Sequence, residues 1–312
     1  MIAADLGGTN LRAAIIDDDG RVLDHVKHPT PRTKTADGIA QAIIEASQTL
    51  AGRNERYNGR VRALSVVVPG TVNVEEGVVT QAPNLPCLDG FRLAAALTDA
   101  LTWPTVLEND ANAAAVGEMW RGAARDRQTI VCLTLGTGVG GGLILDGKLW
   151  RGVDGAAGEI GHIVVEPVGA PCGCGGRGCL EVYSSATAIV RMAREILPHY
   201  PSSPLHTADN LTAEAVYRRG LEGDELAREV FRRMGFYLGV GCASLVNLLN
   251  PEMIVIGGGV VGGWDLFSDH MREQMMARAF AIPARRVEVV RAQCGDSAGL
   301  LGAARLAFAS LV

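Results

Sequence analysis

Two stretches of the chain, AADLGGTNLRAAIIDDDGRVL over residues 3–23 and CLTLGTGVGGGLILDGKLW over residues 132–150, follow one pattern. In each, an apolar strand leads through a short turn of glycine and threonine into a second apolar strand. An Asp-Gly pair then precedes a short third strand. A unit that recurs in two parts of a chain indicates duplication. The repeat therefore predicts an α/β protein of two related lobes, each of which opens on a hairpin.

Helices and strands alternate through the rest of the chain. Periodicity predicts helices near residues 35–51, 91–101, 185–196, 212–219, 225–249 and 297–311, one from residue 111, and another between residues 260 and 286. Buried strands are expected over residues 61–70, 105–110, 252–260 and 286–292. We place the lobe boundary after residue 110, so that the small lobe spans residues 1–110 and the large lobe residues 111–296. The helix over residues 297–312 has an apolar face to bury, and we expect it to complete the first lobe.

The composition favours a folded protein with a small-molecule partner. The 312 residues are 48% hydrophobic, and their formal net charge of -5 offers no broad basic surface for nucleic acid. The longest apolar stretch is interrupted by glycines and is too short to span a bilayer. Because the N-terminus lacks the pattern of a signal peptide, we expect a cytoplasmic protein with reduced cysteines and no membrane partner.

Three glycine turns follow apolar strands: DLGGTN over residues 5–10, LGTGVGGG over residues 135–142 and IGGGV over residues 256–260. Glycine lets successive backbone N–H groups turn toward an anion, and Thr9 adds a hydroxyl donor. One such turn alone is equally typical of an ordinary hairpin. Three such turns in one protein indicate a nucleotide-binding site, in which they would contact the phosphates and the nucleoside.

The segment LENDANAAA, residues 107–115, ends a buried strand and begins an alanine-rich helix. Asn109 and Asp110 are favoured residues for a helix N-cap, which is a sufficient structural explanation for them. A carboxylate at a helix N-terminus also stays ionised, and an ionised carboxylate can accept a proton from a hydroxyl group. Asp110 is therefore a candidate general base.

The segment GEIGHIVVEPVGAPCGCGGRGCLE, residues 158–181, contains three of the seven cysteines. His162, Cys172, Cys174 and Cys179 offer one nitrogen and three sulfur ligands, a closed tetrahedral set for one structural zinc ion. The spacing differs from that of common zinc fingers. A glycine-rich loop with free thiols is the alternative.

Taken together, DLGGTN, ENDANAAA, the segment over residues 135–162 and CGCGGRGCLE resemble the ROK family of sugar kinases and repressors, from Ile2 to Phe308. Among its members, the chain looks most like the ATP-dependent glucokinases. The resemblance implies an actin-like, ribonuclease-H-type fold of two lobes with mixed β-sheets and an active-site cleft between the lobes. It also implies transfer of the γ-phosphate of ATP, with Mg²⁺, to the 6-hydroxyl of glucose.

The resemblance further implies a role for each motif residue. Asp5 would position the magnesium ion, and the cysteine spacing is the zinc signature of the family. The zinc would hold Glu159 and Glu181 in place. The phosphates of ATP would contact Gly7, Gly8, Thr9, Asn10, Thr137 and Gly138, and its adenosine Gly257, Gly258 and Gly259. The sugar would contact Asn84, Asn109, Asp110, Glu159, His162 and Glu181.

Other members of such a family remain alternatives. A kinase for N-acetylmannosamine, N-acetylglucosamine, fructose or allose is one, although Glu159 stands where N-acetylmannosamine kinases tend to have histidine. A sugar-sensing repressor is another, but the first strand begins at Ile2 and leaves no room for a DNA-binding extension. Polyphosphate is disfavoured as the donor because relatives that use it generally lack the cysteines. In the loop beside Asn84, Cys87 and Leu88 stand where many relatives have a Gly-Trp pair. For the assembly, a homodimer or homotetramer is expected.

Overall fold

The structure of the protein is a computed structural model, which describes residues 1–31, 35–53, 60–207 and 210–311. The chain divides into two compact units. Unit 1 consists of Met1–Asp126, Gly142–Gly158 and Gln293–Val312, and unit 2 consists of Arg127–Gly141 and Glu159–Ala292.

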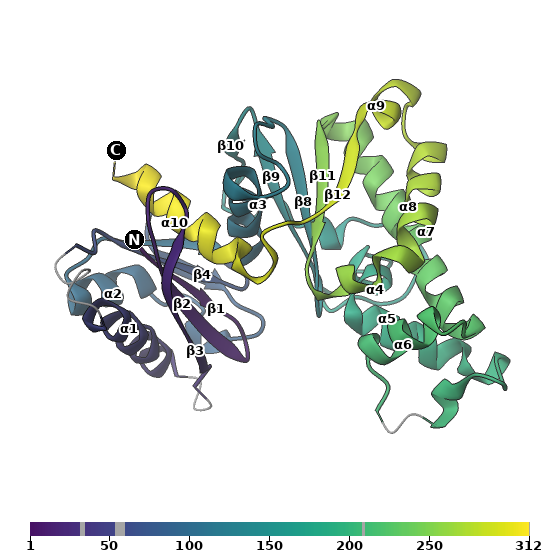
Figure 1. Cartoon of the computed structure of the whole chain (residues 1–312), viewed down its shortest axis with the longest axis horizontal. Helices are drawn as coiled ribbons and strands as arrows, with labels where there is room; N and C mark the ends of the chain where they lie inside the picture. The colour runs from purple at the N-terminus through teal and green to yellow at the C-terminus, as the bar shows by residue number, and fades with distance from the viewer. Residues whose placement is uncertain (32–34, 54–59, 208–209, 312) are drawn as a thin grey trace. The chain divides into compact units, whose positions relative to one another are not determined.

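Unit 1 is built on a five-stranded sheet in the order β3-β2-β1-β4-β7 (Figure 1). The first hairpin of the sequence forms its antiparallel half, and β1, β4 and β7 run parallel. The carboxyl ends of these three strands therefore meet at one edge. The strands are β1 (Ile2–Leu6), β2 (Asn10–Ile16), β3 (Val22–Pro29), β4 (Leu64–Val68) and β7 (Thr105–Asn109).

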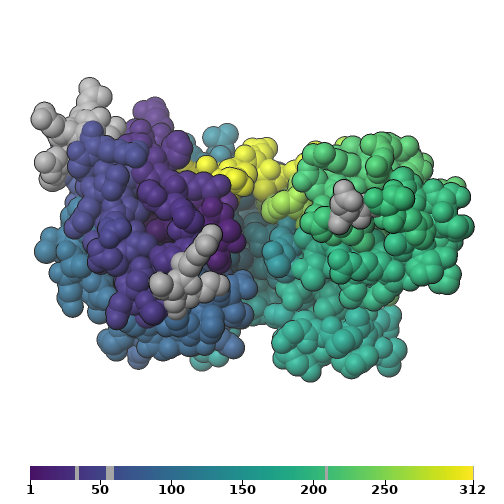
Figure 2. Space-filling view, turned by 90° about the horizontal axis from the view of Figure 1, so that it is seen from below, coloured from purple at the N-terminus to yellow at the C-terminus, as the bar shows by residue number. Residues whose placement is uncertain are grey.

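Helices cover both faces of this sheet. Alternate strand residues point to opposite sides, so each face has its own apolar core. Ile2 and Leu6 pack in one apolar core with α1 (Ala36–Gly52) and α2 (Leu93–Leu101). Ala3 and Val67 pack in a second core, with α3 (Asp110–Arg121) and α10 (Ala298–Ser310). The purple residues of β1 to β3 and α1 cover much of the face that unit 1 presents in Figure 2. The remaining elements are β5 (Thr71–Asn73), β6 (Val78–Gln81), and the 3-10 helices Pro86–Leu88 and Gly295–Ser297.

The two units do not divide the chain after residue 110, where the sequence analysis places the boundary between the lobes. Helix α3 lies in unit 1 because its small residues pack closely against α10. A methyl group on Gly117 would overlap the carbonyl oxygen of Ala298, so a larger residue there would separate the two helices. The segment Gly142–Gly158 also lies in unit 1.

The second sheet has the order β10-β9-β8-β11-β12, and the unit boundary passes through β9. Strands β8, β11 and β12 run parallel, and β9 pairs antiparallel with β10. This order matches that of the first sheet, which confirms the prediction of a duplicated, mixed-sheet α/β fold. The strands are β8 (Ile130–Leu135), β9 (Val139–Leu145), β10 (Lys148–Leu149), β11 (Met253–Gly257) and β12 (Glu288–Arg291).

The helices of unit 2 gather around α7, which packs against α4, α5, α6, α8 and α9 (Figure 1). Among the described residues, no helix is both long enough and apolar enough to cross a membrane. The helices are α4 (Glu181–Ser184), α5 (Ala186–Ile196), α6 (Ala213–Leu221), α7 (Glu225–Leu249), α8 (Trp264–Arg278) and α9 (Ala281–Arg286). Four 3-10 helices span Ile160–His162, Leu197–His199, Pro204–Thr207 and Gly259–Gly263.

Candidate active site

The first glycine turn connects β1 to β2 in unit 1. The N–H of Gly7 donates to the carbonyl of Asn10 at 2.8 Å and closes the turn. Asn84 lies beside it, since a Cβ added to Gly8 would stand 3.6 Å from the Cβ of Asn84. The predicted phosphate turn and one predicted sugar ligand are therefore neighbours in this unit.

The loop that carries Asn84 has a defined shape despite the Cys87-Leu88 pair. Leu88 is fully buried in the core of unit 1, and Cys87 packs against the same core. The carboxylate of Asp89 accepts the N–H of Ala82 at 2.7 Å, which ties the two ends of the loop together. Leu88 thus supplies the apolar anchor of the loop.

Asp110 is the first residue of α3, and Asn109 is the N-cap. The side chain of Asn109 accepts the N–H of Asn112 at 2.9 Å and donates to the carbonyl of Gly70 at 2.8 Å. It also donates to Oδ1 of Asp110 at 3.2 Å, and the N–H of Ala111 donates to the same oxygen at 2.8 Å. An exposed carboxylate at a helix N-terminus with two N–H donors is stabilised as the anion.

Asp5 is a half-buried acid in β1, directly opposite Arg12 in the register with β2. Burial raises the pKa of Asp5 above its usual range, while the positive charge of Arg12 opposes that rise and the negative charge of Asp296 adds to it. Asp5 pairs with Val67 of β4, which pairs in turn with Glu108 of β7. Asp5 therefore lies in the same row of the sheet as the end of the strand that leads into Asp110.

One functional arrangement in unit 1 is missing from the sequence analysis. Glu108 is buried and forms an ion pair with Arg151, with 2.7 Å between Oε2 and Nη2. A signal for it is present, because a carboxylate that ends a buried strand needs a cation nearby. The sequence does not indicate which of its arginines supplies that cation.

The other two glycine turns follow adjacent parallel strands of unit 2. Gly257 pairs with Thr134 where β11 runs beside β8, so the turns at residues 136–138 and 257–259 leave the same edge of the sheet. The first turn is held on two sides. The N–H of Gly136 donates to the carbonyl of Gly138 at 2.9 Å, and the hydroxyl of Thr187 donates to the carbonyl of Thr137 at 2.8 Å.

The ligand atoms of His162, Cys172, Cys174 and Cys179 all lie within 4.8 Å of one another. The Sγ atoms of Cys174 and Cys179 are 3.7 Å apart, as are Sγ of Cys172 and Nδ1 of His162. Zn–S bonds of about 2.3 Å in a tetrahedron give S···S edges of about 3.8 Å, so the residues fit a zinc ion. Desolvation and the neighbouring thiols raise the pKa of Cys179 to about 12, and a bound dication would displace such protons.

The segment 159–181, which we call the cysteine loop, also holds the other predicted sugar ligands of unit 2. Nε2 of His162, the ring nitrogen that faces away from the sulfur atoms, lies 3.9 Å from a carboxylate oxygen of Glu159. Oε1 of Glu181 lies 3.9 Å from Sγ of Cys172, and its Oε2 accepts the N–H of Val139 at 2.9 Å. The structure thus brings the predicted sugar ligands of this unit to the rim of the predicted zinc site.

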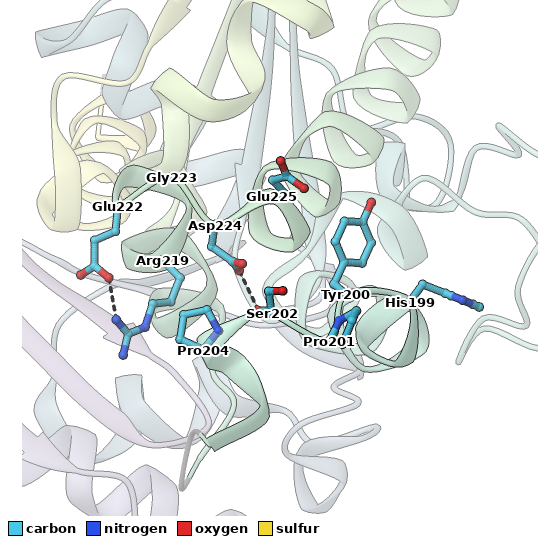
Figure 3. Close-up of a pocket in the computed structure, with 11 residues that line it drawn as sticks. His199, Tyr200, Pro201, Ser202, Pro204, Arg219, Glu222, Gly223, Asp224 and Glu225 are labelled. Atoms are coloured by element: carbon cyan, nitrogen blue, oxygen red, sulfur yellow. Dashed lines mark hydrogen bonds and ion pairs between the residues drawn. The ribbon is translucent and has the colours of Figure 1, made fainter.

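A pocket of about 520 Å³ elsewhere in unit 2 lies between the start of α7 and the segment that precedes α6 (Figure 3). Three of its charged groups, Arg219, Glu222 and Asp224, have partners within the protein. Arg219 pairs with Glu222 at 2.6 Å, and Ser203 donates to Asp224 at 3.0 Å. None of the predicted site residues lines this pocket.

Comparison with known proteins gives the class of the fold. The crystal structure of a ROK family glucokinase from Streptomyces griseus, in complex with glucose and AMPPNP, matches with a TM-score of 0.84 and 35% identity over 98% of each chain. The protein therefore has the two-lobe, actin-like α/β fold of these sugar kinases. The glucokinase of Halalkalibacterium halodurans is 36% identical over 96% of this chain and 92% of its own. The glucokinase of Thermotoga maritima is 35% identical over 98% and 96%.

The ROK family profile matches residues 1–310. The chain belongs to the ROK family.

Proposed function

We propose that the protein is an ATP-dependent glucokinase, which transfers the γ-phosphate of ATP to the 6-hydroxyl of glucose. The glucokinases that it resembles match it over nearly their whole length. The observation on which the proposal depends most is the carboxylate of Asp110, exposed at the first position of α3 and held by two N–H donors. Such a group suits the role of a general base toward a hydroxyl.

The remaining groups of unit 1 would serve the nucleotide and the sugar. Backbone N–H groups of the turn Gly7–Asn10 would bind phosphate oxygens, and Asn84 and Asn109 would orient the sugar hydroxyls. Asp5 would position Mg²⁺, which neutralises the charge of the polyphosphate when it is bound. Asp110 would take the proton of the 6-hydroxyl as the new P–O bond forms.

The groups of unit 2 would complete both sites. Thr137 and Gly138 would bind phosphate, and the turn at Gly257–Gly259 would contact adenosine. Glu159, His162 and Glu181 would bind the sugar hydroxyls. We assign a structural zinc ion to the cysteine loop because four protein ligands leave no position for a substrate.

The test is a coupled assay of ADP release with glucose, N-acetylmannosamine, N-acetylglucosamine, fructose and allose, for the wild-type protein and Asp110→Asn. Glucose should give the highest kcat/KM. Asp110→Asn should fold, because the cap is Asn109, yet lose about a hundredfold or more in kcat. A well-folded Asp110→Asn protein with wild-type turnover would remove Asp110 from the mechanism, and a preference for another sugar would overturn the glucose assignment.

A homodimer or homotetramer remains our proposal for the assembly. Leu248, Phe280 and Ile282 are 80%, 73% and 77% exposed in unit 2. Phe280 is next to the end of α7, because its N–H donates to Oδ1 of Asn247 at 2.7 Å. Exposed apolar side chains that lie together are typical of contact surfaces, and light scattering of the eluting protein would give its mass.

A further inference from the structure

The side chain of Glu108 is buried at the end of β7, with 1% of its surface exposed, and its partners all lie in unit 1. Oε2 accepts the Nε–H of Arg151 at 2.8 Å and lies 2.7 Å from Nη2. Oε1 accepts the backbone N–H of Asn109 at 3.0 Å and the side-chain N–H of Asn112 at 3.1 Å. The carboxylate therefore has a guanidinium on one oxygen and two neutral donors on the other.

The two neutral donors lie on either side of the proposed base. Asn109 immediately precedes Asp110, and Asn112 follows it in the first turn of α3. The side chain of Asn109 also caps α3 and donates to Oδ1 of Asp110. Glu108 thus holds the backbone N–H before Asp110 and the side chain of Asn112 after it.

Arg151 belongs to a loop of unit 1 that packs against the rest of that unit. Its carbonyl accepts the N–H of Ala157 at 3.0 Å, which closes the loop. Gly155, at φ +83, lies so close to Val72 that an added Cβ would stand 2.5 Å from its carbonyl oxygen. The side chain of Arg151 is 33% exposed and reaches from this loop to the buried carboxylate.

We propose that Arg151 is a positioning residue for phosphoryl transfer and acts on Asp110 through Glu108. The inference rests on the proposed function, because it takes Asp110 as the base. A buried carboxylate without a cation is costly, so loss of the guanidinium makes the side chain of Glu108 move toward water or admit water. A displaced Glu108 no longer holds both asparagine N–H groups in place. A base that moves by about 1 Å costs on the order of a hundredfold in rate.

The first test compares kcat and KM of the wild type, Arg151→Met and Arg151→Lys. Arg151→Met should lower kcat by about tenfold to a hundredfold, with the KM for glucose within about threefold because Arg151 is no sugar ligand. Arg151→Lys keeps the charge and should lose less. The matched control is Arg127→Met, which removes the half-exposed pair with Glu288 and should leave kcat within about twofold.

Two further measurements make the test specific. The double variant Glu108→Gln/Arg151→Met has no buried charge and should regain about threefold or more in kcat over Arg151→Met. If Arg151→Met fails to fold, the comparison of Arg151→Lys with the wild type keeps the test decisive. In hydrogen–deuterium exchange followed by NMR, the amides of Asn109 and Asn112 should exchange about tenfold faster in the Arg151 variants, while those of β1 stay unchanged.

The outcomes separate this proposal from the proposed function. A kcat for Arg151→Met within about twofold of the wild type, a loss confined to KM, or an equal loss in Arg127→Met overturns the role of Arg151. Wild-type exchange at Asn109 and Asn112 does the same. A wild-type protein that phosphorylates none of the sugars overturns the proposed function and with it the catalytic role of Arg151. The exchange experiment then still decides whether Arg151 fixes the start of α3.

Discussion

The carboxylate of Glu181 accepts a hydrogen bond from the backbone N–H of Val139, with 2.9 Å between the oxygen and the nitrogen. Val139 directly follows the second glycine turn, and Glu181 ends the cysteine loop. One side chain in unit 2 thus joins the proposed sugar ligands to a proposed phosphate turn. The two substrates need not bind independently.

Two substitutions of Glu181 should separate these roles. Glu181→Gln keeps a carbonyl oxygen that can accept the N–H of Val139, so the affinity for AMPPNP should stay within about threefold while the KM for glucose rises about tenfold or more. Glu181→Ala removes the acceptor and should weaken both ligands. Calorimetric titration of each ligand measures this, with Glu195→Gln on the exposed face of α5 as the control. Equal AMPPNP affinity in the two Glu181 variants would show that the hydrogen bond to Val139 does not shape the phosphate turn.

The same contact predicts a difference between two neighbouring glycines. A Cβ on Gly138 would overlap Oε2 of Glu181, whereas one on Gly136 would meet no atom within 4 Å. Gly138→Ala should therefore lower the free energy of unfolding by about 1–3 kcal/mol, and Gly136→Ala by about 0.5 kcal/mol or less. Urea unfolding followed by circular dichroism compares the pair. Equal losses would mean that Glu181 moves aside without cost.

The sequence predicts the regular parts of this fold well. The apolar runs joined by glycine and threonine turns in the hairpins, and clear helical periodicity near α1, α5 and α7, give elements that the structure confirms. The short pair β5 and β6, and helix α9, are missing from the prediction because each is too short to show a period. The sequence assigns residues from 111 onward, and with them helix α3, to the large lobe, whereas α3 belongs to unit 1, because a repeat shows where a unit begins but not which helix packs on which sheet.

In the candidate site, the sequence predicts the features that depend on neighbouring residues and misses the contacts between segments far apart in the chain. Asn109 and Asp110 are recognisable because capping is decided within a few residues. The partner of Glu108 is not, since Arg151 is far along the chain and is brought to it by the folded loop. The contact of Glu181 with Val139 also joins distant segments, so only the structure reveals it.

Asp5→Asn should stabilise the protein while it disables catalysis. Because burial raises the pKa of Asp5 in the folded state, the folded protein keeps this proton to higher pH than the unfolded chain does. The free energy of unfolding therefore falls as pH rises from about 4, the pKa of an exposed carboxyl, through the raised value. At pH 7 the full cost of the buried charge is present, and Asp5→Asn should gain on the order of 1 kcal/mol.

Thermal unfolding of wild type and Asp5→Asn between acidic and neutral pH measures this effect. The gain should shrink as the pH falls from the raised pKa of Asp5 toward about 4 and vanish below it, because both proteins then carry a neutral group at this position. The control is Asp296→Asn, whose side chain is 96% exposed, and which should change stability by about 0.5 kcal/mol or less. A gain that is the same at every pH would assign it to packing instead of charge.

Metal analysis of the purified protein should find about one zinc ion per chain. Cys174→Ser removes one of the four ligands and should lose that zinc, while Cys87→Ser, in the core of unit 1, should keep it. Absence of stoichiometric zinc from protein never exposed to a chelator would contradict the assignment.

Zinc and magnesium should then act on different ligands. Four protein ligands would fill the shell of a bound zinc ion, which would then have no position for a phosphate oxygen and would serve only to hold the cysteine loop. Without it, Glu159, His162 and Glu181 lose their common support, and the affinity for glucose should fall by about tenfold or more. The turn at Gly257–Gly259 contributes no cluster ligand, and Asp5 and Gly7–Asn10 belong to unit 1, so these groups should still bind the nucleotide.

Calorimetric titration into native, zinc-depleted and magnesium-free protein measures these affinities. Removal of magnesium should leave glucose binding nearly intact and stop phosphoryl transfer, because Mg²⁺ would neutralise the polyphosphate and Asp5, which would position it, is not among the proposed sugar ligands. The two depletions therefore have opposite signatures, which a general loss of folding would not produce. A zinc-free protein that binds glucose as tightly as the native one would show that the cysteine loop does not depend on its metal to hold the sugar ligands.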